Sequence, residues 1–111
     1  MAGSIKRIAG PAYIAASATD IYTPAASTIY TVIRHIHVAN VTGGAVTFTL
    51  YVGATGGSAA GTELFKAKAI AANDTYDWYG NLKMLSTDFL TGLASAGSAV
   101  VITVMGEQVV V

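Results

Sequence analysis

The feature that most restricts the fold of this chain is a two-residue alternation of apolar and polar side chains over residues 45–53. Successive side chains of a β-strand point to opposite faces of a sheet, so this pattern predicts a strand with one apolar face and one face of Thr and Tyr. We expect the apolar face to enter a core and the other to meet solvent or a partner. The apolar set is Val46, Phe48, Leu50 and Val52.

Short runs of β-branched residues, separated by clusters of Gly, Asn, Asp and Ser, occupy most of the remaining chain, which is typical of all-β domains. We expect residues 87–93 to form a turn or a single helical turn. About eight strands are enough for a two-sheet β-sandwich resembling a jelly roll. The predicted strands cover residues 11–16, 19–23, 28–40, 45–53, 63–71, 75–79, 82–85 and 99–105.

The longest predicted strand, residues 28–40, has an interruption at Arg34. Either Arg34 reaches past the edge of the core, or a β-bulge resets the alternation there. The glycines of the turn at residues 41–44 suit a hairpin connection to the next strand. The apolar positions that line up at a spacing of two on the two sides of Arg34 are Tyr30, Val32, Ile36 and Val38.

The two ends differ from the middle of the chain. Residues 1–10 are short and polar and predict an N-terminal arm, followed by a β-sandwich domain at 11–107. Residues 108–111 form an apolar C-terminal tail, which either completes a sheet of its own subunit or adds to a neighbour's sheet. We expect no signal peptide, because the start lacks an apolar run of the required length.

Charge is scarce throughout. Only 11% of the residues are charged, with zero formal net charge, whereas roughly 25% is usual in soluble domains. A free monomer of this composition is prone to association, so we expect much of the surface to be covered by other subunits. A secreted or cell-surface domain rich in Ala, Gly and Thr is the alternative. Nucleic acid is not an expected partner, since phosphate binding requires a basic patch, and residues 89–106 are too interrupted to predict a membrane span.

Side chains suited to catalysis are few, and we expect a non-enzymatic protein without a metal or cofactor. His35 and His37 share one strand face, but no third ligand lies near them in the sequence; Asp77 is one of several acids that could approach in three dimensions. A pH-sensitive contact suits the histidines better than metal ligation does. Asp74 and Asp77 are the closest carboxylate pair, and their place at a turn favours capping of backbone amides over acid–base catalysis.

An aromatic cluster follows this turn. Tyr76, Trp78 and Tyr79 could stack on sugar rings, which would make the chain a carbohydrate-binding module. The alternation places Tyr76 and Trp78 on one face, and we favour their packing in a core or an interface.

The order of strands and turns resembles that of small virion proteins of tailed bacteriophages. The resemblance spans residues 19–107: the segment 33–40, a Gly turn, the alternating strand 46–52, the Asn-Asp-Thr turn before Trp78, and Asp88 leading to a final Val-rich strand. It implies a β-sandwich component of the particle without enzymatic activity. A capsid decoration protein, often trimeric, and a tail or neck component both fit this pattern.

We favour decoration, with copies of this chain and the major capsid protein or other virion proteins as partners and the virion as its location after synthesis in the host cytoplasm. We expect the N-terminal arm and the C-terminal tail to contact neighbouring subunits. We also expect His35, His37 and Tyr51 to form an outward-facing surface that contacts other proteins. The interface candidates are Ile5, Lys6, Arg7, Ile8, His35, His37, Tyr51, Val109, Val110 and Val111.

Overall fold

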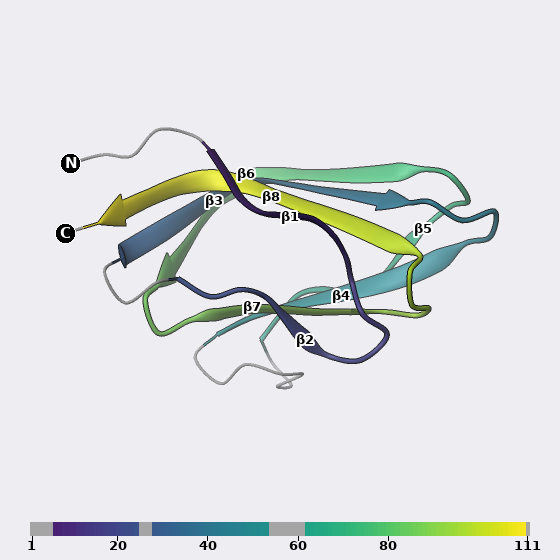
Figure 1. Ribbon diagram of the computed structural model, residues 1–111, viewed down its shortest axis with the longest axis horizontal. Coiled ribbons are helices and arrows are strands. Elements are labelled where there is room, and N and C mark those ends of the chain that lie inside the picture. Colours follow the sequence, from purple (N-terminus) through teal and green to yellow (C-terminus); the bar gives the residue numbers. More distant parts are fainter. Residues whose placement is uncertain (1–5, 25–27, 54–61, 111) are drawn as a thin grey trace.

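The computed structural model describes residues 6–24, 28–53 and 62–110, and this part of the chain contains eight β-strands (Figure 1). Within the same residues no helix is long and apolar enough to cross a bilayer. The strands are β1 (Lys6–Tyr13), β2 (Thr19–Tyr22), β3 (Thr28–Asn40), β4 (Val46–Gly53), β5 (Glu63–Ile70), β6 (Thr75–Leu85), β7 (Phe89–Ala94) and β8 (Val100–Val110).

These described strands form two antiparallel sheets that pack face to face as two layers (Figure 1). Sheet A has the order β1-β8-β3-β6 and sheet B the order β2-β7-β4-β5. Neighbours within a sheet are mostly distant in sequence, as expected when a chain crosses repeatedly between two layers. The prediction of an all-β sandwich of about eight strands is confirmed.

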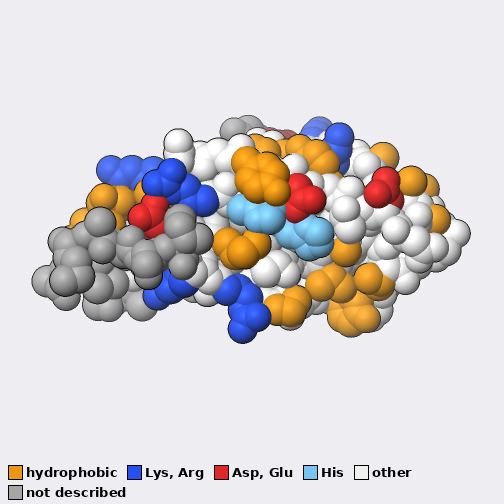
Figure 2. Space-filling view, turned by 90° about the horizontal axis from the view of Figure 1, so that it is seen from above, with side chains coloured by type: hydrophobic (Ala, Val, Ile, Leu, Met, Phe, Trp, Pro, Cys, Tyr) orange, Lys and Arg blue, Asp and Glu red, His pale blue; other side chains and the backbone are white. Residues whose placement is uncertain are grey.

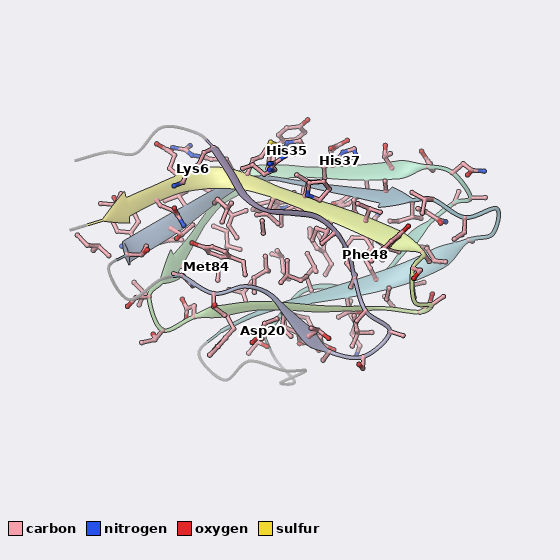
Figure 3. The ribbon with its side chains drawn as sticks, viewed as in Figure 1. Lys6, Asp20, His35, His37, Phe48 and Met84 are labelled. Atoms are coloured by element: carbon pink, nitrogen blue, oxygen red, sulfur yellow. The ribbon has the colours of Figure 1, made fainter. Side chains whose placement is uncertain are left out.

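The core lies between the two sheets, and the alternation of β4 is confirmed. Phe48 and Leu50 are fully buried and Val52 packs against the same cluster, while Tyr51 faces away. Figure 3 shows Phe48 of sheet B and Met84 of sheet A both pointing into the space between the layers. Every buried side-chain nitrogen and oxygen of the described residues has a hydrogen-bond partner, so the interior is internally satisfied.

A β-bulge interrupts β3 at Arg34. The pairing of β3 with both of its neighbours shifts register between Ile33 and His35, so Arg34 is an extra residue relative to β8. Its exposed guanidinium donates from Nε to Glu107 Oε2 at 2.8 Å and from Nη1 to Asn81 Oδ1 at 2.5 Å. The bulge is therefore tied to β8 on one side and to β6 on the other.

This bulge decides which side chains of β3 face the core. Of the two alternatives at Arg34, the β-bulge is confirmed, and its extra residue resets the alternation. Tyr30 and Val32 therefore do not share the buried face of the later apolar residues: both are only half buried, whereas Thr31 and Ile33 are buried. The buried residues of β3 are Thr28, Thr31, Ile33, Ile36, Val38 and Asn40.

Gly106 of β8 lies at the level of the bulge, paired with Ile33 on one side and with Lys6 on the other. A Cβ atom at this position would lie 2.1 Å from the carbonyl oxygen of Val32 and 2.8 Å from Cδ1 of Ile8. The absence of a side chain is what lets β1, β8 and β3 approach each other here.

A second bulge lies in β5 and explains its irregular pattern. The pairing with β4 shifts register between Phe48 and Leu50, and Ala67 of β5 has a positive φ of 49°. Phe65 and Ile70, whose spacing is odd, both contact the core because the bulge lies between them. Sequence alone left the face assignment of this segment ambiguous.

Three other strand boundaries differ from the prediction. The segments 75–79 and 82–85 are one strand, β6, because β3 pairs with it along its length and accommodates Gly80 and Asn81 at the register shift. Residues 89–94 form β7 instead of a helical turn, since Leu90 is buried in the core. The last strand extends from Val100 to Val110 because β3 offers it a partner throughout.

The described part of the expected N-terminal arm, residues 6–10, forms the first half of β1. This polar segment lies at the edge of sheet A, where a strand pairs with one neighbour only, here β8. Its side chain Ile8 packs against the core. At the other end, Val109 and Val110 pair with β3, so these two residues complete a sheet of their own chain. β1 begins and β8 ends at the same end of the molecule (Figure 1).

Asn40 organises the turns at the opposite end of β3. It is only 2% exposed, and its Nδ2 donates to the carbonyl oxygens of Gly44, Ile70 and Ala71 at 2.7, 3.2 and 3.1 Å. Its Oδ1 accepts from the backbone N and from Oγ1 of Thr42. One buried amide thus fixes the 41–44 turn against the end of β5.

Candidate functional site

The outer face of sheet A brings together chemically active side chains from β3 and β6. His37 lies directly opposite Asp77 in the ladder, and His35 lies opposite Tyr79, so all four project from the same face. Figure 2 shows the two histidines side by side near the middle of this face, with acidic and hydrophobic side chains around them. Figure 3 shows both histidines on the outer side of the upper sheet.

Asp77 connects the two imidazoles, and we call His35, His37 and Asp77 the His–Asp cluster. Its Oδ1 lies 2.7 Å from Nε2 of His35 and 2.6 Å from Nδ1 of His37. Because an ionised carboxylate only accepts, each imidazole N–H donates a hydrogen bond to the same oxygen. These hydrogen bonds, from His37 first and His35 second, lower the pKa of Asp77 below its usual value and keep the carboxylate ionised.

The cluster is accessible but held in place. The side chains of His35, Asp77 and His37 are 22%, 34% and 39% exposed. The ring of Tyr79 stacks on His35 with centroids 4.4 Å apart and an angle of 7° between the planes. Backbone pairing on both strands and this stacking restrict the orientations that the imidazoles can take.

Among the described residues, these three are the one group of His, Cys, Asp and Glu side chains with ligand atoms close enough to hold a metal ion. All three ligand atoms lie within 4.8 Å of one another. Sequence reasoning identified the histidine pair and named Asp77 among four possible acids. Asp77 is the acid that reaches the histidines because it lies opposite His37 in the β3–β6 ladder. This register cannot be read from the sequence.

The other interface candidates are distributed over the molecule. Lys6, Arg7 and Ile8 lie in β1 at the edge of sheet A, and Val109 lies in β8 opposite Tyr30. Tyr51 belongs to β4 of sheet B and faces away from the core, so it does not join the histidines on one surface. The backbone of Val110 pairs with β3, while Ile5 and Val111 lie outside the described residues.

The aromatic residues of β6 divide between its two faces. Tyr76 and Trp78 pack against the core and meet Phe65 edge to face, with centroids 5.5 Å and 6.4 Å from its ring. Tyr79 points the other way and is 72% exposed. The expectation that Tyr76 and Trp78 pack in a core is confirmed, and the three rings do not form one platform.

A small hollow lies between the end of β1 and the start of β2. Its lining is apolar apart from Thr19 and Asp20 and includes Ile14 and Ile102. With a single carboxylate and no nearby imidazole in its lining, it offers less chemistry than the His–Asp cluster.

No protein-family model and no curated protein matches this chain. Among solved structures, it is similar to a chain from Bacillus endospore appendages, which are described as a novel family of disulfide-linked pili. The match covers 100% of this chain and 91% of that chain, with a TM-score of 0.53 and 18% sequence identity. At this identity the likeness shows a shared fold.

Proposed function

We propose that this chain is a non-enzymatic structural subunit that assembles with copies of itself and with other proteins, as a capsid decoration protein of a tailed bacteriophage. The observation that carries the assembly role is a surface with few charged side chains that exposes large apolar ones. Isolated exposed apolar residues are ordinary, but so few charges on so small a domain are not. Within residues 6–24, 28–53 and 62–110, the large apolar side chains that are half exposed or more are Tyr13, Ile29, Val41, Tyr79 and Leu85.

Part of the small charge complement is also neutralised locally. Arg34 and Glu107 form an ion pair on the outer face of sheet A. This pairing reduces the electrostatic repulsion that keeps monomers apart. This supports association through the face of sheet A that carries Tyr79.

The similar Bacillus chain comes from a pilus, so a sandwich of this kind can serve as the subunit of an assembly. That assembly is described as disulfide-linked. The present chain has no cysteine, so its own contacts must be non-covalent and rest on apolar burial and hydrogen bonds. Burial of apolar area contributes about 25 cal/mol per Å² before the cost of ordering is subtracted, and repetition over a lattice multiplies modest contacts.

The capsid location rests on the resemblance of the strand and turn pattern to tailed-phage virion proteins. A tail or neck component is the alternative within the same class. A carbohydrate-binding module is less well supported, because Tyr76 and Trp78 are engaged with the core and leave Tyr79 as the exposed ring.

The first test is the molecular mass of the purified chain over a wide concentration range, by light scattering and sedimentation. We expect oligomers that grow with concentration and are insensitive to reducing agent. The second test is the addition of the chain to phage heads that lack it, followed by electron microscopy. A chain that stays monomeric and leaves every virion part uncoated would contradict the proposal.

A further inference from the structure

We propose that His35, His37 and Asp77 form a binding site for one divalent transition-metal cation, such as Zn²⁺, on the outer face of sheet A. This proposal does not rest on the proposed assembly function, although the site lies on the face of sheet A that carries Tyr79. It rests on the position of three ligand atoms, two imidazole nitrogens and one carboxylate oxygen, that two neighbouring strands bring together.

The backbone sets the spacing of the ligands. His35 and His37 are two residues apart on β3, which places both rings on one face, and Asp77 of β6 lies directly opposite His37. The ligand atoms therefore converge from three Cα positions on two hydrogen-bonded strands. Sites built on strands are held more accurately than sites on loops.

The distances suit a cation between the ligands after a small rotation of the side chains. Asp77 Oδ1 lies 2.6–2.7 Å from the two nitrogens, with a proton in each contact. A tetrahedral zinc site with bonds of about 2.0–2.1 Å separates its ligand atoms by roughly 3.4 Å. Each nitrogen must therefore move about 0.7 Å away from the oxygen, and the two nitrogens, which lie within 4.8 Å of each other, must approach to a separation of roughly 3.4 Å. Partly exposed side chains can make both changes by rotating.

The donor set selects the class of metal. Two imidazoles and one carboxylate suit zinc, copper, nickel and cobalt, whereas calcium and magnesium prefer oxygen ligands. The carboxylate contributes a negative charge at neutral pH, since its pKa lies below the usual value. The nearby Arg34 guanidinium is engaged by Glu107 and Asn81. Three protein ligands leave a further position for water.

Tyr79 acts as an orienting residue for this site. Its ring covers one face of the His35 imidazole and limits rotation about the side-chain bonds. Groups that fix the orientation of a ligating histidine typically change metal affinity by about 10–100-fold when removed. The stacking gives the site a rigidity that an isolated pair of surface histidines lacks.

The alternative is that the cluster only fastens β3 to β6 through hydrogen bonds. The two explanations differ for Asp77→Asn, which keeps an acceptor oxygen but removes the charge that a cation requires. They also differ for His35→Gln and His37→Gln, whose amides still donate hydrogen bonds but ligate zinc poorly.

The experiment is calorimetric titration of the full chain with zinc chloride, for the wild type and each of these three variants. We expect one ion per chain for the wild type and an affinity at least about tenfold lower for each variant. Asp74→Asn is the matched control, because it removes a carboxylate three residues away and outside the cluster. It should bind zinc within about twofold of the wild type.

Cobalt(II) provides a second readout, because the visible absorption of the bound ion reports its coordination geometry. This absorption should appear when cobalt is added to the wild type and should be absent with Asp77→Asn. Circular dichroism and urea midpoints establish that each variant is folded; if one histidine variant unfolds, the other and Asp77→Asn decide. Three results would overturn the proposal: variants that bind zinc like the wild type, calcium that binds as tightly as zinc, or half an ion per chain with dimerisation.

Discussion

Replacement of Gly106 by alanine should destabilise the fold far more than the addition of one methyl group usually does. The added Cβ would meet the carbonyl oxygen of Val32 at 2.1 Å, and neither group belongs to a flexible side chain. Ordinary contact requires at least about 1 Å more, so β3 and β8 must separate at the bulge. Because Arg34 already ties the bulge to Glu107 and Asn81, the backbone of β3 cannot move away from the added Cβ without breaking these contacts.

The magnitude follows from two contributions. Overpacking a well-filled site costs about 1–3 kcal/mol. Weakening a ladder hydrogen bond adds about 1 kcal/mol. We therefore expect Gly106→Ala to lower the free energy of unfolding by about 3 kcal/mol, a large share of the roughly 5–15 kcal/mol of a typical domain. The melting temperature should fall by roughly 12–24 °C.

Urea denaturation followed by circular dichroism measures this loss, with Gly97→Ala as the matched control. Gly97 lies in an exposed turn, where an added Cβ meets no atom within 4 Å. The control should differ from the wild type by no more than about 0.5 kcal/mol. If Gly106→Ala proved as stable as Gly97→Ala, the close approach of the three strands, and with it the described register, would be refuted.

Three further substitutions test the other parts of the structure. Asn40→Ala removes a buried amide with five contacts and should cost about 2–4 kcal/mol in urea denaturation, whereas a loss below about 0.5 kcal/mol would contradict its structural role. Trp78→Ala should lower stability by about 3 kcal/mol or more, because the ring packs on the core; a stable variant that lost only glycan binding on an array would instead favour the carbohydrate module. Asp77 has a lowered pKa in the folded chain, so its contribution to stability is present above the ordinary Asp value of 3.8 and disappears as the pH falls through the lowered pKa. Measured with a chelator present, the stability difference between the wild type and Asp77→Asn should shrink as the pH is lowered below the ordinary Asp value of 3.8, and a constant difference would contradict the hydrogen-bonded carboxylate.

The parts of the fold that depend on local alternation could be predicted from the sequence, whereas those that depend on pairing with a distant strand could not. The alternation of Phe48 and Leu50 in β4 was sufficient because every second side chain enters one core. Gly80 and Asn81 suggested a turn, but pairing with β3 keeps them within a strand, and that pairing is a tertiary property. Sequence placed a β-bulge at Arg34 as one of two alternatives, which the structure confirms, but it did not locate the bulge near Ala67, because that segment is compatible with more than one alternation.

The candidate site was predictable only in part, for a related reason. The spacing of His35 and His37 placed both rings on one face, which the structure confirms. Asp77 was indistinguishable in sequence from the other acids, because its selection depends on the register between β3 and β6. The stacking of Tyr79 depends on the same register.

The extra residue in β3 also decides on which side of sheet A the imidazoles lie. Ile33 and Ile36 both point inward, an odd separation that an unbroken strand cannot accommodate. Deleting residue 34 would remove the extra residue, so the residues on either side of it would alternate regularly and keep their present faces. Arg34→Ala would leave these faces unchanged too, so zinc titration should give similar affinities for the two variants. Loss of zinc binding in the deletion variant alone would show that the faces are not set at this position.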